Sequence, residues 1–460
     1  MPPITFTDST FATNSVRMLK LALPITVGQL AIVGMSVTDI IIAGRLSTND
    51  LAAVTLGSTV FNLSIMLVLG IILGNGPIIG QLFSAGKTDA LRGQFQNCLW
   101  LCLPLGLLCS IFIGTGIVLL PRLDSPAEIT GIATSYLLPM IGSAFLLPYI
   151  MAFRTTFESM GQARTAMVFN VAGFMINIPL DYALVMGHWG LPALGGAGCG
   201  WATFFISFLI VVGETLYARR ASTLQAYQLL GSRQVIDSQR LKETLRIGLP
   251  IGGAILAEGG FFLLIPLLVA HLGAVTVSGH SVAISFDWMM FMVPMGISQA
   301  ISILVAHEMG LQRPRQAQQV CATGLGLTSV IALCQGSFVL LFREQIAALF
   351  SPDAAVQELA ATLLVYAAIF RVFDAINIGG NGALRGYKDT HITWALACIG
   401  YWLVGFPLAY SLALSDFWGP ALGVEGFWIG IVIALILTAS LTSARVYFTA
   451  RKAVLISGSA

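Results

Sequence analysis

The stretch LKLALPITVGQLAIVGMSVTDIIIA, residues 19–43, indicates the class of this protein, because it is long and almost entirely apolar. A helix needs about 20 mostly apolar residues to cross a lipid bilayer. The stretch is too long for a signal peptide and has no cleavage-like end, so we expect it to remain in the mature chain as the first membrane helix.

Eleven similar stretches follow it along the chain. Hydrophobic residues make up 57% of the sequence, charged residues only 10%, and the mean hydropathy is +0.87. A soluble domain has about a quarter of its residues charged, so the composition predicts a surface that faces lipid. We predict an all-α membrane protein with about twelve transmembrane helices, near 18–43, 51–83, 95–120, 132–153, 165–187, 196–218, 246–270, 277–306, 317–341, 357–380, 391–413 and 424–447.

The basic residues are distributed unevenly between the two sides of these spans. Nineteen of the 23 Lys and Arg residues, Arg154 and Arg233 among them, fall on one side; three fall on the other, and Arg371 lies inside a span. Loops rich in Lys and Arg stay in the cytoplasm. We therefore predict that both termini and the long loop at 219–245 are cytoplasmic. The asymmetry also suits a bacterial inner membrane, an assignment that rests in addition on the family resemblance given below.

The two halves of the chain repeat one another at a spacing of about 226 residues. Each repeat holds six spans, an even number, so both halves must enter the membrane from the same side. This predicts two six-helix lobes related by a parallel repeat, 1–218 and 246–460, joined by a cytoplasmic linker at 219–245. Transporters built in this way bind substrate between the halves near the midplane; the alternative is an old duplication without a mechanistic role. The matches are Leu23-Pro24-Ile25 with Leu249-Pro250-Ile251, Pro179-Leu180 and Tyr182 with Pro407-Leu408 and Tyr410, and Ala193-Leu194-Gly195 and Gly198 with Ala421-Leu422-Gly423 and Gly426.

Several other classes of function lack support in the sequence. The formal net charge of +2 gives nucleic-acid binding no electrostatic basis. Neither HExxH nor GxSxG is present, and the seven cysteines lack metal-type spacing, so we predict neither an enzyme nor a cofactor.

Ionisable side chains inside the spans are the candidate functional residues, because each costs about 2.5–3.5 kcal/mol on insertion scales. Asp39 lies deep in the first span, Glu258 in the seventh and Asp374 late in the tenth. In the fifth span, Asn177 and Asp181 share one helix face. Carboxylate and amide oxygens suit a proton or a small cation, and a carboxylate in low dielectric binds a proton more readily than in water.

Each assignment has a structural alternative. Asp181 is near a helix end and is equally compatible with an interfacial position. Arg371 precedes Asp374 by three residues and offers a neutralising partner. His280 and Asp287 lie seven residues apart in the eighth span, which suits either a shared cavity or a structural polar pair.

The chain resembles the NorM-like group of the multidrug and toxic compound extrusion (MATE) transporters over nearly its whole length. Four pieces in the same order carry the resemblance: Leu21-Ala22-Leu23-Pro24 with Thr38-Asp39 and Ala43-Gly44; Gly80-Gln81-Leu82-Phe83 with Ala85-Gly86-Lys87; Pro192-Ala193-Leu194-Gly195-Gly196-Ala197-Gly198; and Gly382-Ala383-Leu384-Arg385-Gly386-Tyr387-Lys388-Asp389-Thr390.

The resemblance implies efflux of lipophilic organic cations by alternating access, in exchange for inward Na⁺ or H⁺, by a monomer that needs no cofactor beyond this ion. It implies a cation site in the amino-terminal lobe, with Asp39, Asn177 and Asp181 as metal ligands if the ion is Na⁺. It also implies acidic substrate or coupling positions in the carboxy-terminal lobe. The matching residues are Asp39, Asn177, Asp181 and Thr203 in the first lobe, and Glu258 and Asp374 in the second.

Two other functions are compatible with a polytopic membrane protein. A lipid-linked oligosaccharide flippase on a related scaffold needs several basic groups for a pyrophosphate, and only Arg371 is predicted inside a span. A channel or sensor needs neither the repeat nor the buried acids.

Overall fold

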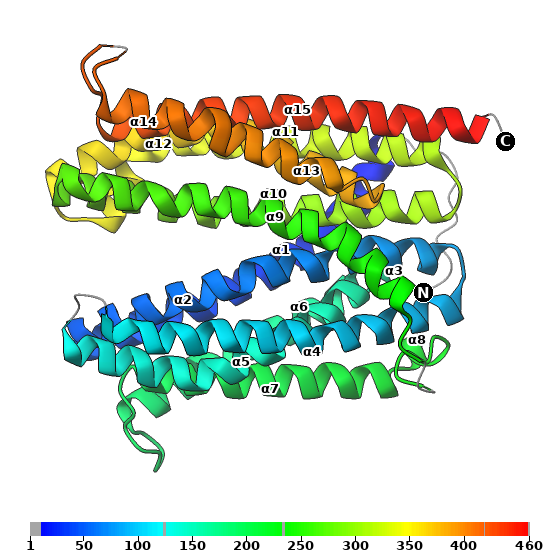
Figure 1. Ribbon diagram of the computed structural model, residues 1–460, viewed down its shortest axis with the longest axis horizontal. Coiled ribbons are helices and arrows are strands. Elements are labelled where there is room, and N and C mark those ends of the chain that lie inside the picture. Colours follow the sequence, from blue (N-terminus) through cyan, green and yellow to red (C-terminus); the bar gives the residue numbers. More distant parts are fainter. Residues whose placement is uncertain (1–10, 123–125, 232–234, 418, 459–460) are drawn as a thin grey trace. The chain divides into compact units, whose positions relative to one another are not determined.

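The computed structural model describes residues 11–122, 126–231, 235–417 and 419–458, apart from the side chains of residues 270, 457 and 458. Arg233 and part of the predicted linker lie outside these residues. The described chain contains helices and no strand, which confirms the all-α prediction (Figure 1). The α-helices of seven or more residues are α1 Phe11–Leu46, α2 Thr48–Leu73, α3 Asn75–Ser84, α4 Thr88–Leu119, α5 Ala127–Ser159, α6 Ala163–Met186, α7 Ala197–Arg220, α9 Ser238–Val269, α10 Ala274–Gly310, α11 Pro314–Phe350, α12 Ala354–Gly386, α13 His391–Ala397, α14 Phe406–Leu414 and α15 Val424–Gly458.

Twelve segments of the described chain are long and apolar enough to cross a membrane, as predicted. Two segments combine shorter helices: α2 continues into α3 after Gly74, and α13 continues into α14 through a π-helical segment, Cys398–Gly405. Short elements complete the chain: the four-residue helix α8 (Ser222–Gln225) and two 3₁₀ turns, Leu120–Arg122 and Ala270–Leu272. Many helices extend beyond the predicted spans by one or two turns.

This extension corrects the position of Arg154, which we had counted among the loop residues. Arg154 lies inside α5, where its side chain is only 3% exposed and its Nε donates a 2.8 Å hydrogen bond to Glu158. The predicted span stopped one residue before Arg154, because a basic residue at the end of an apolar window is assigned by default to the adjoining loop.

The described helices form two compact units. One contains residues 27–252, and the other contains residues 1–26 together with 253–460. Each unit has its own apolar core, built on Tyr136 and Leu137 in the first and on Phe261 and Trp428 in the second. The lobes inferred from the repeat, 1–218 and 246–460, rest on sequence correspondence rather than on packing and stay a prediction.

A close helix crossing joins α2 to the first part of α9 within the unit 27–252. A Cβ added at Gly70 would overlap the backbone of Gly252, and one at Gly74 would come within 2.7 Å of the backbone of Gly248. Small residues let helix backbones approach in this way inside membranes. Backbone atoms cannot rotate away as a side chain can, so this crossing requires glycine.

We therefore expect Gly70→Ala to lower the free energy of unfolding by about 1–3 kcal/mol. Gly114→Ala is the matched control, since no described residue outside its own helical turn has an atom within 4 Å of the position of the added methyl group. The apparent melting temperatures of the two variants in detergent provide the comparison. Equal melting temperatures would show that the crossing tolerates separation.

The π-helical segment Cys398–Gly405 also shapes the second unit. Added methyl groups at Gly400 and Gly405 would meet Thr438 and Ala434 of α15, so the segment lies directly against that helix. Insertions of this kind inside α-helices often occur at functional sites. Here the segment carries Tyr401, whose side chain is 1% exposed.

One acidic residue between the spans has a clear structural role. Asp389 follows α12 and accepts hydrogen bonds from Arg445 at 2.8 and 3.0 Å and from Thr449 at 2.6 Å, both on α15. Burial alone would raise the pKa of Asp389, but these hydrogen bonds outweigh it and hold the pKa below its ordinary value. The stabilisation from this link is therefore present above the ordinary carboxyl pKa and is lost as the pH falls through the lowered value.

Candidate functional site: a buried carboxylate pair

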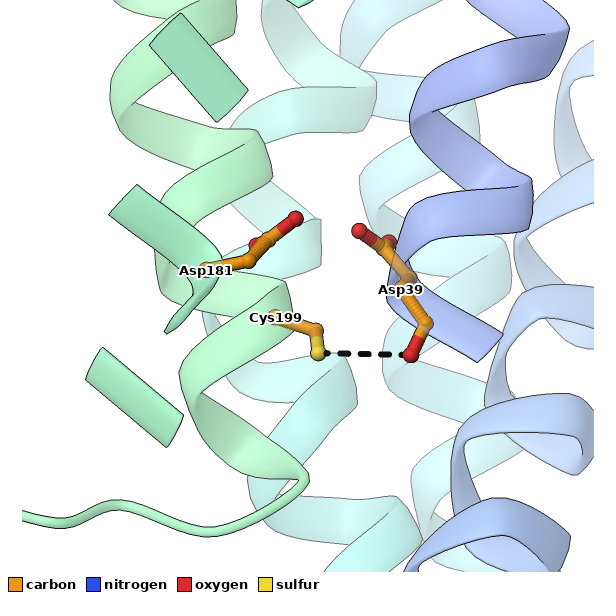
Figure 2. Close-up of side chains that lie close together, drawn as sticks. All are labelled: Asp39, Asp181 and Cys199. Atoms are coloured by element: carbon orange, nitrogen blue, oxygen red, sulfur yellow. Dashed lines mark hydrogen bonds between the residues drawn. The ribbon is translucent and has the colours of Figure 1, made fainter. Parts of the chain in front are cut away.

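Three helices of the unit 27–252 bring the first candidate site together. Asp39 comes from α1, Asp181 from α6 and Cys199 from α7, and their ligand atoms lie within 4.8 Å of one another. Figure 2 shows the two carboxylates pointing toward each other, with the Cys199 thiol beside the backbone of Asp39. Asn177 and Thr203 also face the Asp39 carboxylate. The structure thus places all four predicted residues of the amino-terminal site in one cluster.

Local sequence accounts for this convergence. Asn177 and Asp181 are four residues apart and so lie on one face of α6, with Pro179 between them inside the helix. Cys199 and Thr203 are likewise four residues apart on α7. The Thr203 hydroxyl donates to Asp39 Oδ2 at 3.5 Å, and the Cys199 thiol donates to the Asp39 carbonyl oxygen at 3.7 Å.

The polar atoms of this cluster are buried and largely unsatisfied. Asp39 is 5% exposed, and Asn177 and Asp181 are 0% exposed. Five of their side-chain atoms have no hydrogen-bond partner among the described residues: Asp39 Oδ1, both polar atoms of Asn177 and both oxygens of Asp181. Leaving a buried polar atom unpaired costs about 1–3 kcal/mol, and more for a charged group.

This arrangement has a definite chemical capacity. Two carboxylates that face each other in a buried site cannot both stay charged without compensation, so they share a proton or bind a cation. Their oxygens and the Asn177 amide oxygen are hard donors, which suit H⁺ or an alkali cation, whereas the Cys199 thiol is a soft ligand. Most of the set therefore suits H⁺ or an alkali cation, and only the Cys199 thiol would suit a transition metal.

A second acidic group lies in the other unit. Tyr401, on the π-helical segment, donates a 3.1 Å hydrogen bond to Glu258 Oε1 on α9. Asn377 of α12 donates to the Tyr401 hydroxyl at 3.4 Å and accepts from Thr442 of α15 at 3.1 Å. Asp374 is near enough to Glu258 for their charges to interact. The structure therefore brings Glu258 and Asp374 near each other, beside a polar network that links four helical segments.

Arg371 connects Asp374 to a third carboxylate. Its guanidinium donates to Asp374 Oδ2 at 3.1 Å, forms an ion pair with Asp287 of α10, and donates to the Asp287 carbonyl oxygen at 2.9 Å. Arg371 is thus shared between Asp287 and Asp374. Together with Glu258, the group contains three carboxylates and one guanidinium, so its acidic side chains outnumber its basic ones.

His280 and Asp287 do not form a pair. His280 Nδ1 accepts a 3.2 Å hydrogen bond from the Trp428 indole, and the two rings meet edge to face. Asp287 contacts Arg371 instead. His280 therefore belongs to the packing of α10 against α15.

Cys199 and Tyr401 of these sites, and Glu214 elsewhere in the unit 27–252, were not singled out from the sequence. Cys199 and Tyr401 gave no signal, because a cysteine or a tyrosine in an apolar span is compatible with ordinary packing. Glu214 did carry one, since it lies inside the predicted span 196–218. It belongs to a separate buried cluster with Arg154 and Glu158.

Comparison with known proteins assigns this sequence to one family. A model of the MatE family matches residues 24–183 and again residues 250–411, which places the internal repeat on two copies of one family unit. The chain is a multi-pass membrane protein with a transporter fold, and it belongs to the MATE family.

Curated relatives cover almost the full length. The chain is 34% identical to the multidrug resistance protein PmpM of Pseudomonas aeruginosa, over 95% of this chain and 92% of that protein. It is 32% identical to the multidrug resistance protein MdtK of Pectobacterium atrosepticum, over 96% of this chain and 97% of that protein. Both relatives are thus bacterial proteins named for multidrug resistance.

Solved structures show the same fold at lower identity. An outward-facing MATE family transporter of the MOP superfamily aligns with a TM-score of 0.84 and 20% identity, over 94% of this chain and 96% of that one. The eukaryotic MATE transporter AtDTX14 aligns with a TM-score of 0.82 and 23% identity, over 97% of this chain and 99% of that one.

Proposed function

We propose that this protein is an antiporter that exports lipophilic organic cations in exchange for inward H⁺ or Na⁺. The observation that supports it best is the buried pair Asp39 and Asp181. Their carboxylates face one another, and three of the four oxygens have no hydrogen-bond partner among the described residues. Names of the relatives, multidrug resistance proteins PmpM and MdtK, agree with drug efflux. The exporter needs no cofactor beyond the coupling ion, works as a monomer, and has both termini in the cytoplasm.

In this proposal the coupling ion binds in the unit 27–252. A proton bound between Asp39 and Asp181 removes the repulsion of two buried charges, and Na⁺ would instead be held by their oxygens and that of Asn177. Either ion draws α1 and α6 together, because Asp39 and Asp181 come from those two helices. Ion and drug act on one conformational equilibrium, so each lowers the affinity for the other by the same factor.

The exported cation is proposed to interact with the acidic group of the other unit. Glu258 and Asp374 supply negative charge, and Met and aromatic side chains supply adaptable apolar contacts. The flippase alternative needs a free basic group for a pyrophosphate. Arg371 does not meet this need, since it is already engaged by Asp287 and Asp374.

The test is efflux of ethidium, a fluorescent lipophilic cation, from proteoliposomes with Na⁺ and pH gradients imposed separately. We expect one gradient to drive efflux and the other to have little effect, which also identifies the coupling ion. Vesicles that lack protein are the control. Absence of ethidium flux under both gradients, with folded protein, would favour the flippase. Flux at channel rates without any gradient would indicate a channel.

A further inference from the structure

A second group of buried charges lies in the unit 27–252, apart from the Asp39–Asp181 pair. Arg154 and Glu158 of α5 form an ion pair at 2.8 Å, and each side chain is 3% exposed. Arg154 also donates to Gln29 Oε1 of α1 at 3.4 Å. Glu214 of α7 is 1% exposed and interacts electrostatically with both members of the ion pair.

The charges of this group do not balance. It contains two carboxylates and one guanidinium, and Arg154 is already bonded to Glu158. Glu214 Oε2 is buried and has no hydrogen-bond partner among the described residues. An uncompensated charge in such a position is costly enough that the group binds a neutralising ligand instead.

Among the described residues of the surrounding helices, no other charged side chain supplies the compensation. On α1, Arg17 pairs with Glu308, and Lys20 and Arg45 are exposed. The remaining charged residue of α1 is Asp39 of the carboxylate pair. On α6 the charged residues are Arg164, which is exposed at the first turn, and Asp181, which belongs to the carboxylate pair. On α7 the remaining ones are Arg219 and Arg220, exposed in its last turn. Helix α3, which packs against α5, carries none.

The available atoms suit a proton better than a metal cation. A bound cation needs several oxygen ligands, but Glu158 Oε1 and Gln29 Oε1 already accept hydrogen bonds from Arg154. A proton needs a single oxygen, and Glu214 Oε2 supplies it. We propose that Glu214 carries a proton at neutral pH and forms a second protonation site in this unit.

The position of this site relates it to the carboxylate pair. Glu214 lies eleven residues beyond Thr203 on α7, and Gln29 lies ten residues before Asp39 on α1, which is about 15 Å along each helix. The buried Asn170 of α6 lies beside Gly28, next to Gln29. The distance of about 15 Å along the helices between the Glu214 site and the carboxylate pair is about half the thickness of the hydrocarbon core. If the proposed antiport function holds, Glu214 is a second proton-binding residue in the unit that also contains the carboxylate pair.

Infrared spectroscopy of purified protein tests this site without any transport measurement, so its result is independent of the antiport proposal. The starting protein is the variant Asp39→Asn with Asp181→Asn, which removes the carboxyl signals of the pair. At pH 7 we expect Glu214→Gln to remove one protonated-carboxyl band. Since the protonated acid and the amide are alike in shape and charge, this variant is expected to fold.

A second variant tests the charge balance and leaves Glu214 in place. Glu158→Gln removes the competing carboxylate, so Glu214 is expected to ionise beside Arg154 and the same band is expected to vanish. Glu128→Gln, at an exposed position of α5, is the control and leaves the band unchanged. A band that persists in Glu214→Gln or in Glu158→Gln overturns the proposal. A band that disappears when Na⁺ is added at constant pH assigns the group to Na⁺ and overturns it as well.

Discussion

Replacement of Asp39 by asparagine is expected to lower ion-driven ethidium efflux by about 100-fold, to the level of vesicles without protein. The substitution keeps the size of the side chain and removes the charge that faces Asp181. The remaining site has one carboxylate instead of two, so it loses the repulsion that ion binding relieves. Initial efflux rates in proteoliposomes with matched amounts of protein provide the measurement.

The control for this variant is Asp89→Asn. Asp89 is an acidic residue with an 88% exposed side chain, and it pairs with Arg92 on the same helix. It is expected to retain wild-type efflux, because an exposed pair of this kind contributes little to stability. If Asp39→Asn is inserted and folded normally yet retains coupled efflux, the carboxylate pair is not the coupling site.

Replacement of Arg371 by methionine is expected to destabilise the other unit by about 3–5 kcal/mol. The substitution leaves Asp287 and Asp374 without their shared partner, in positions where their side chains are 12% and 6% exposed. Removing one member of a buried ion pair is costly because the other charges stay in place. The apparent melting temperature in detergent and the folded yield from membranes measure the loss.

Two further variants separate charge from packing. Arg122→Met, at an exposed arginine, is expected to leave stability unchanged. The triple variant Arg371→Met with Asp287→Asn and Asp374→Asn removes the charges together and is expected to recover most of the loss. A single Arg371→Met variant as stable as the wild type would mean that Arg371 does not neutralise these carboxylates.

The fold could be predicted largely because its main determinant is local. Each span can be recognised from a run of about 20 mostly apolar residues. The repeat can be recognised from short matches such as Leu23-Pro24-Ile25 with Leu249-Pro250-Ile251. Helix ends were less predictable. Arg154 was assigned to a loop because hydropathy alone cannot identify a buried partner such as Glu158, one turn further along α5.

The candidate sites were predictable only where a charged or amide side chain stands out against an apolar background. Asp39, Asn177 and Asp181 satisfy that condition, and the structure brings them together. Their neighbour Cys199 does not, since its contact with Asp39 depends on how α7 packs against α1. The partnership of Arg371 with Asp287 joins residues 84 positions apart, a distance at which no local pattern acts. Tyr401 reaches Glu258 from a π-helical segment whose insertion has no simple sequence signal.

Binding of tetraphenylphosphonium to purified protein, measured by calorimetry over a range of pH and Na⁺ concentrations, tests the central claim most directly. For the wild type we expect the coupling ion to weaken binding by about 5–150-fold, as expected for two ligands that oppose each other on one equilibrium. The variant Asp39→Asn with Asp181→Asn is expected to bind the probe with an affinity that no longer depends on that ion. An equal dependence in the variant and the wild type would contradict the account and place the coupling site outside the carboxylate pair.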